Sequence, residues 1–213
     1  TEKALKTAFV LAEVSRVNGL SDETFRSIPF SSFKNVIAEK NPNYDKLVSL
    51  FYNLQDKTLS SKTLREALSY TIPDSFKEGE RSASPFHPLS FANQEGTGKS
   101  YQDIEHANNL LSKFKTEQNA EKISITISTL DKYKNTASEI ANIWKTLGID
   151  VKIKTVDEIP QSFQVFLGDF NLSKDPDQYV LWHSDQINNI THYNNLRIDK
   201  LLEDGRQTTD IGK

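Results

Sequence analysis

Two stretches of strict alternation flank a helical pattern in the middle of the chain. Hydrophobic and polar residues alternate over 122–128 and again over 151–155, which is typical of half-buried strands. Between them, apolar residues of 135–147 recur at helical spacing, and Gly148 stands where a helix C-terminus favours glycine. Strand, helix and strand in this order predict a βαβ unit with a right-handed crossover in a largely parallel sheet.

The remaining pattern predicts further elements of both kinds. We expect strands at 33–39 and 47–52, paired as a hairpin around a turn at 41–43, and another strand at 163–167. Helices are expected at 3–12, at 22–28 after a Ser21 cap, at 60–70 with a serine cap, at 101–114 and at 197–205. Asp175-Pro176-Asp177 predicts a helix start, with Asp175 as the cap and Pro176 in the first turn. Residues 72–100 lack periodicity and predict a long packed loop.

Composition excludes several classes of protein. The 213 residues carry 26 Lys and Arg against 29 Asp and Glu, and this net charge of −3 gives no electrostatic footprint for nucleic acid. The absence of cysteine excludes disulfides and zinc–thiolate sites, and no stretch is apolar enough to span a bilayer. The chain has no Met, so we expect Thr1 to be a cut or processed end. No cofactor is predicted.

Candidate motifs each have a plain structural interpretation. The segment 96–100 (GTGKS) suggests a phosphate-binding loop, but Asn93 stands where that loop needs a glycine, so a simple turn is favoured. His183 and His192, nine residues apart, leave open a shared ligand or metal role. No GxSxG or HExxH motif is present. The aromatic residues of the irregular segments suit either core packing or the walls of a ligand cleft; they are Phe86, Tyr179, Trp182 and Tyr193.

Seven segments, in order, resemble the family 5 extracellular solute-binding proteins, the substrate receptors of peptide and nickel ABC importers. The most specific is Leu50-Phe51-Tyr52-Asn53 followed by Leu64-Arg65-Glu66-Ala67-Leu68-Ser69-Tyr70. Residues 13–20 resemble a short strand of that family, and the others are 85–91, 101–111, 140–154, 175–179 and 193–202. The resemblance covers about residues 10–213. It implies a periplasmic-binding-protein-like (type II) α/β lobe with a mixed, mostly parallel sheet flanked by helices.

The same resemblance implies the domain organisation and the function. Residues 1–213 are expected to be a single lobe, the second of two, truncated at both ends. Such a protein captures peptides or a related small solute outside the membrane and delivers it to the permease. We therefore expect an extracytoplasmic monomer, in the periplasm or lipid-anchored at the outer face of the membrane, and no enzyme activity. The alternatives are a surface structural domain that has lost transport and a hydrolase that uses His183 or His192.

The ligand is expected near the carboxyl ends of the parallel strands, the usual ligand position in open α/β sheets. The predicted ligand-binding residues are Phe86, His87, Asp169, Asp175, Tyr179, Trp182 and His183. Peptide-binding members of the family hold the peptide's amino group with an Asp a few residues before the DP motif. This chain has Asn171-Leu172-Ser173-Lys174 there, and Asp169 lies further upstream. Because of this departure, the predicted solute is a peptide or a related small solute.

Overall fold

A computed structural model describes residues 1–39, 44–93 and 101–208. The chain divides into two compact units, Thr1–Pro42 and Asn43–Lys213. The predicted turn at 41–43 and the GTGKS segment at 96–100 lie outside the described residues.

The first unit contains α1 (Glu2–Val10), α2 (Asp22–Arg26) and the 3₁₀ turn η1 (Phe30–Ser32). Polar contacts join its helices, because the Glu2 carboxylate accepts hydrogen bonds from the hydroxyls of Ser21 and Thr24, both at 2.6 Å. The predicted Ser21 cap is confirmed, since its Oγ accepts from the Thr24 N–H. None of the residues of α1 is buried.

Two strand predictions in the first unit are wrong. Residues 33–39 form no strand, and neither do residues 13–20. Phe33 instead packs edge-on against Phe9, with ring centroids 5.9 Å apart, and Ile37 is exposed. A strand needs a neighbouring strand to pair its backbone N–H and C=O groups. Hydrophobic and polar residues do not alternate over 33–37, so a strand there would have no apolar face to bury.

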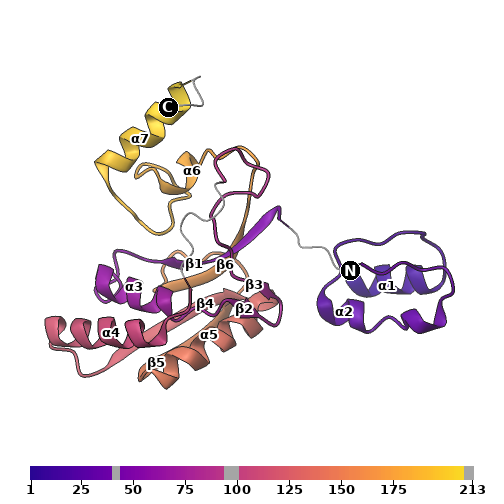
Figure 1. Ribbon diagram of the computed structural model, residues 1–213, viewed down its shortest axis with the longest axis horizontal. Coiled ribbons are helices and arrows are strands. Elements are labelled where there is room, and N and C mark those ends of the chain that lie inside the picture. Colours follow the sequence, from indigo (N-terminus) through magenta and orange to yellow (C-terminus); the bar gives the residue numbers. More distant parts are fainter. Residues whose placement is uncertain (40–43, 94–100, 209–213) are drawn as a thin grey trace. The chain divides into compact units, whose positions relative to one another are not determined.

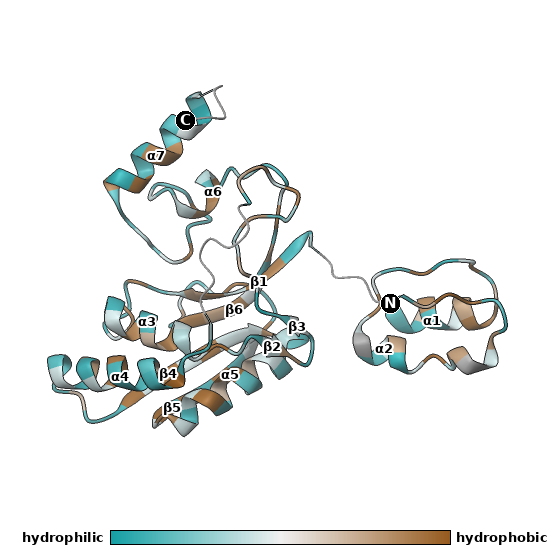
Figure 2. Cartoon of the chain, viewed as in Figure 1, coloured by the Kyte–Doolittle hydropathy of each residue, from teal (hydrophilic) through white to brown (hydrophobic). Residues whose placement is uncertain are grey.

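A four-stranded mixed sheet organises the second unit (Figure 1). Its strands, in spatial order, are β1 (Lys46–Tyr52), β6 (Val165–Asn171), β4 (Ile123–Leu130) and β5 (Ile149–Val156). β4 pairs in parallel with both β5 and β6, which confirms the predicted parallel βαβ unit. β1 runs antiparallel to β6, so the predicted hairpin of 33–39 with 47–52 is wrong. The strands β1 and β6 are largely hydrophobic (Figure 2).

Helices α3 (Lys62–Tyr70), α4 (Ile104–Gln118) and α5 (Lys134–Thr146) share one hydrophobic core with this sheet. The core contains the alternating residues Ile123, Ile125 and Ile127 of β4, each at most 2% exposed. Local signals set the ends of the helices. The hydroxyl of Ser61 and the carboxylate of Asp103 accept N-terminal amide hydrogen bonds of α3 and α4. Gly148 adopts φ +78°, as its predicted place after α5 requires.

Trp144 of α5 joins two parts of the core. Its side chain is fully buried, and its Nε1–H donates to the Thr71 hydroxyl at 2.7 Å. Beyond Thr71, the segment predicted as an irregular loop contains a short hairpin of β2 (Ser75–Phe76) and β3 (Gly79–Glu80). A 3₁₀ turn, η2 (Asp131–Tyr133), connects β4 directly to α5.

The C-terminal segment, residues 173–208, contains α6 (Tyr179–Trp182) and α7 (Leu196–Gln207). The predicted helix start at Asp175 is wrong, because α6 begins four residues later without a side-chain cap. The Asp175 carboxylate accepts from the Asp177 N–H at 3.0 Å, and the Asp177 carboxylate accepts from the Tyr179 N–H at 3.0 Å. These successive local turns occupy the amides that a helix would use.

Candidate functional site

Asp169 lies near the C-terminal end of β6, at the sheet edge where the ligand was predicted. Its carboxylate contacts two ammonium groups, with Lys132 Nζ at 2.7 Å from Oδ1 and Lys46 Nζ at 3.3 Å from Oδ2. Lys132 belongs to η2, just after the C-terminal end of β4, and Lys46 begins β1. We call Lys46, Asp169, Lys132 and Tyr133 the edge cluster. It combines the ends of three neighbouring strands.

The electrostatics of the edge cluster favour its charged forms. Burial raises the pKa of the Asp169 carboxyl, but hydrogen bonds from Lys132, Tyr133 and Lys46 outweigh it and leave the pKa below its usual value. The hydrogen bond to Asp169 in turn raises the pKa of the Lys132 ammonium. Lys132 also lies over the Tyr133 ring, 4.7 Å from its centroid. At neutral pH the cluster therefore holds two cations around one anion.

The loop that contains Phe86 and His87 is tied to the start of β1. His87 is 4% exposed, and its Nδ1 accepts from the Leu89 N–H at 3.0 Å. Since Nδ1 is an acceptor, the ring proton lies on Nε2, which faces the Asp45 carboxylate at 3.8 Å. The His87 ring also contacts Tyr44 edge-on. Phe86, next to it, is half-buried.

Gln178 connects this loop to α6. Its Nε2 donates to the Pro85 carbonyl at 3.2 Å, and its Oε1 accepts from Trp182 Nε1 at 2.9 Å. The Trp182 ring meets Tyr193 edge-on, with centroids 6.5 Å apart. Trp182 therefore keeps its indole N–H satisfied while its half-buried ring remains partly exposed.

Tyr179 packs within the protein between two side chains. The His183 ring stacks on it at 4.3 Å, and the Arg206 guanidinium lies 4.0 Å from its centroid. The Arg206 Nε and Nη2 both donate to Oδ2 of Asp177, at 2.9 and 2.6 Å. These donors lower the pKa of the Asp177 carboxyl, although burial opposes them. The contacts hold the start of α6 against the end of α7.

His183 is also used internally. It is 5% exposed, its Nδ1 accepts from the Asp185 N–H, and its Nε2 lies 3.4 Å from the Glu203 carboxylate. The neighbouring Ser184 donates through both its N–H and its hydroxyl to Asp199, a buried residue of α7. His183 thus stabilises the packing of α6 on α7, and its side chain is covered.

The structure therefore separates the predicted ligand-binding residues into groups. Asp169, the loop of Phe86 and His87, and Trp182 are linked stepwise through Lys46, Asp45 and Gln178. Tyr179 and His183 pack instead toward α7, and Asp175 forms a local turn. The sequence analysis did not single out the neighbours of Asp169, which are Lys46, Lys132 and Tyr133. Asp169 was predicted because ligands bind at the carboxyl ends of parallel strands, and the same rule applies to the turn after β4.

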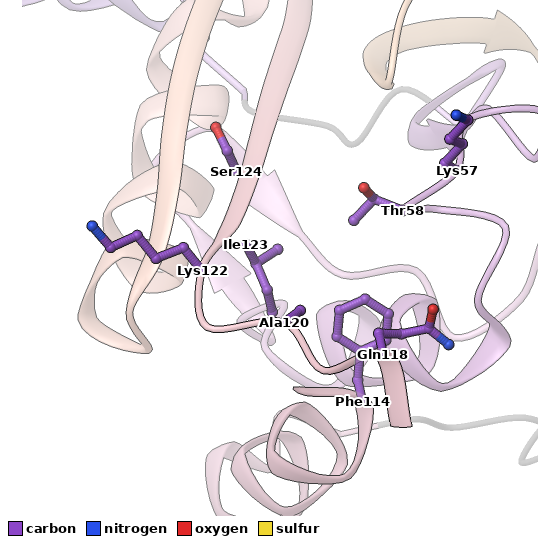
Figure 3. Close-up of a pocket in the computed structure, with 8 residues that line it drawn as sticks. All are labelled: Lys57, Thr58, Phe114, Gln118, Ala120, Lys122, Ile123 and Ser124. Carbon is purple, nitrogen blue, oxygen red and sulfur yellow. The ribbon is translucent and has the colours of Figure 1, made fainter. Parts of the chain in front are cut away.

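Two hollows lie elsewhere in the second unit. One, of about 230 Å³, is at the N-terminal end of β4, with Lys57 and Lys122 on opposite sides and the Phe114 ring between them (Figure 3). The other, of about 340 Å³, lies near the C-terminal end of β1 and is lined by residues that include Gln55, His192 and Tyr193. Because β1 is antiparallel to β6, both hollows lie at the sheet edge opposite Asp169.

Within the described ranges 1–39, 44–93 and 101–208, no group of three or more His, Cys, Asp or Glu side chains is placed to hold a metal ion. The helices in the same ranges are all too short or too polar to cross a membrane.

Comparison with known proteins identifies the family. Residues 19–191 match the bacterial extracellular solute-binding proteins, family 5 Middle. Comparison with curated proteins gives no match. Among solved structures, the chain is similar to the ABC transporter substrate-binding protein CtaP from Listeria monocytogenes, with a TM-score of 0.84 at 20% identity. It is also similar to AppA from Clostridium difficile, with a TM-score of 0.81 at 22% identity.

Each match covers nearly all of this chain but less than half of the solved structure. The match covers 100% of this chain and 47% of CtaP, and 99% of this chain and 47% of AppA. The periplasmic binding protein DppA from Helicobacter pylori, solved in complex with the peptide STSA, has a TM-score of 0.73 at 17% identity. That match covers 99% of this chain and 44% of DppA. The chain thus spans about half the length of the solved structures that it resembles.

The chain belongs to the bacterial extracellular solute-binding proteins of family 5, since the match covers most of its length. This confirms the family that the ordered motifs predicted. The similarity to solved structures also confirms the predicted fold class, a periplasmic-binding-protein-like α/β lobe with a mixed, mostly parallel sheet.

Proposed function

We propose that the chain is one lobe of the substrate-binding component of an ABC importer, and that it captures peptides or a related small solute outside the membrane. The observation that carries the proposal is the family match over residues 19–191. The peptide held by DppA, which has the same fold, supports peptides as the first solutes to test. Delivery to a membrane permease, a monomeric state and an extracytoplasmic location, with or without a lipid anchor, are parts of the same proposal.

We further propose that the solute binds at the edge formed by Asp169, the loop of Phe86 and His87, and Trp182. Asp169 lies at the end of the parallel strands where open α/β sheets bind their ligands, and the loop and Trp182 are linked to it stepwise through Lys46, Asp45 and Gln178. Tyr179 and His183 then contribute indirectly, because they hold α6 on α7 and do not contact the solute. In this arrangement the chain supplies one wall of a cleft, and a second lobe supplies the other. Closure of the lobes on the solute shifts an open–closed equilibrium.

Calorimetry tests the proposal on two samples. The protein as its gene encodes it is expected to bind peptides of two to five residues saturably, with a Kd near or below about 1 μM. The 213-residue chain alone is expected to bind the same peptides at least about a hundredfold more weakly, because it holds only one wall of the cleft. Micromolar binding by the chain alone would overturn the one-wall interpretation.

The rival activities give different results in the same assay. A hydrolase that uses His183 would consume the peptides, with turnover lost in His183→Ala. A structural surface domain would bind none of the solutes tested. Either outcome, obtained with the gene-encoded protein, contradicts a role in solute capture.

A further inference from the structure

The acid of the edge cluster is covered, while its two cations face solvent. The Asp169 side chain is 10% exposed, whereas Lys46 is 49% and Lys132 is 51% exposed. A ligand that approaches this edge therefore meets two ammonium groups before it meets the carboxylate.

Strand register and chain connectivity place these three groups together. Lys46 is opposite Asn171 in the β1–β6 ladder, so it lies diagonally across from Asp169 on the same face of the sheet. Lys132 reaches the same carboxylate from the turn that follows β4. The ring of Tyr133, the next residue, lies beside the Lys132 ammonium, whose Nζ is 4.7 Å from the ring centroid. The arrangement thus depends on the register of β1 with β6 and on the turn after β4, which bring the three side chains together.

The carboxylate of Asp169 is poorly accessible to a ligand ammonium. It is 10% exposed and already contacts two lysine ammonium groups, so an incoming ammonium would have to approach between two like charges. The cluster carries two positive charges and one negative charge, which leaves a local charge of +1. Asp45, the acid next to Lys46 in sequence, lies 3.8 Å from His87 and is 86% exposed, so the charge of +1 is that of the cluster's own side chains. Like charges repel and opposite charges attract, so the exposed face of the cluster favours an anion.

We propose that the edge cluster binds an anionic group of the solute, a carboxylate, through the ammonium groups of Lys46 and Lys132. Asp169 and Tyr133 are positioning residues that hold the two lysines at the end of the sheet. This inference rests on the proposed function only in taking the bound anion to be part of the captured solute. The competing hypothesis is that the Asp169 carboxylate binds the amino group of a peptide directly.

Two small probes separate these possibilities. N-acetyl-Ala-Ala carries a free carboxylate and no ammonium, and Ala-Ala-amide carries an ammonium and no carboxylate. Titration of the isotope-labelled 213-residue chain, followed by amide NMR shifts, measures weak binding and locates it. We expect N-acetyl-Ala-Ala to shift amides of residues 46–48, 131–134 and 168–171 saturably, and Ala-Ala-amide to shift them at least tenfold more weakly.

Variants test each role. Lys132→Gln and Lys46→Gln are expected to weaken N-acetyl-Ala-Ala binding by about tenfold each, the loss of one exposed charge-assisted contact. Lys132→Arg keeps the charge and is expected to retain binding within about threefold. Lys134→Gln, which removes the same charge two residues away, is the matched control and is expected to change the Kd less than about twofold. Asp169→Asn removes the charge that holds the two ammonium groups in place and is expected to weaken N-acetyl-Ala-Ala binding several-fold, with unchanged amide spectra of β4 and β5.

Opposite outcomes overturn the inference. The first is that Ala-Ala-amide binds more strongly than N-acetyl-Ala-Ala and that this binding disappears in Asp169→Asn. The second is that Lys132→Gln and Lys134→Gln lose the same amount of affinity for N-acetyl-Ala-Ala. The third is that neither probe gives a saturable shift. Each variant is first checked for unchanged amide spectra of β4 and β5, so a folding defect is recognised. Capture of peptides by the gene-encoded protein is measured separately, so the proposed function stands or fails independently of this charge preference.

Discussion

The sheet core and the C-terminal segment of the second unit are stabilised by different kinds of contact. The core that surrounds β4 and α5 consists of apolar side chains such as Ile125, Ile127 and Trp144, which are fully buried. Residues 173–208 bury polar groups instead, including His183, Asn189 and Asp199, and each has hydrogen-bond partners. Apolar burial is non-directional, whereas buried polar groups require defined geometry. The first region therefore provides stability, and the second holds particular side chains in place.

The largest expected effect is a cavity in the sheet core. Ile127→Ala removes a fully buried side chain from the central strand β4, and we expect it to lower the free energy of unfolding by about 2–5 kcal/mol. Urea unfolding measures the loss. Ile187→Ala, at a position 95% exposed in the C-terminal segment, is the control and is expected to change stability by less than about 0.5 kcal/mol. Equal losses at the two sites would contradict the assignment of stability to the core.

A smaller, local effect is expected at Asn189. Its carboxamide donates to the Tyr193 carbonyl at 2.7 Å and accepts from the Thr191 hydroxyl at 2.9 Å and the Tyr193 N–H at 3.2 Å. Asn189→Ala removes the donor to the Tyr193 carbonyl and the acceptor of the Thr191 hydroxyl, at a cost of about 1–3 kcal/mol. Hydrogen exchange should accelerate over residues 183–195 and stay unchanged over 123–130. Equal acceleration in both regions would show that the two are a single cooperative unit.

The edge cluster predicts a pH dependence. The folded pKa of Asp169 is lowered from an unfolded value of about 3.9, so the folded protein binds fewer protons at this group. Its stabilising effect is therefore complete above about pH 4 and is lost as the pH falls through the lowered folded pKa. We expect wild type to exceed Asp169→Asn in stability at pH 6, and the difference to shrink toward pH 2.5. A difference independent of pH would contradict the ion pairs at Asp169.

The smallest effect is expected at the α6–α7 ion pair. Arg206 and Asp177 are both partly exposed, and pairs of this kind contribute little. Arg206→Lys keeps the charge but loses the two-nitrogen contact and the planar stacking on Tyr179. We expect thermal unfolding to show only a small loss of stability, smaller than that of Asn189→Ala, together with an Asp177 pKa, measured by NMR, that rises toward its ordinary value. A loss as large as that of Asn189→Ala would mean that this pair is more than a surface contact.

The same contrast explains what could be predicted from sequence. Alternation at Ile123, Ile125 and Ile127 has one structural meaning, because a half-buried strand repeats every two residues. The apolar core and its βαβ unit were therefore predictable. Asp175-Pro176-Asp177 has two meanings, since the same side chains cap helices and close local turns, and the structure uses the turns. The partners of Asp169 were not predictable from local pattern, because Lys46 and Lys132 come from segments 86 residues apart in the chain.

The most direct test of the account is a crystal structure of the gene-encoded protein with a bound solute. We expect solute density at the C-terminal ends of β4 and β6, within contact distance of Lys132 and of the loop that contains Phe86. Density in the hollow between Lys57 and Lys122 would place the ligand at the opposite edge of the sheet and contradict the proposed site.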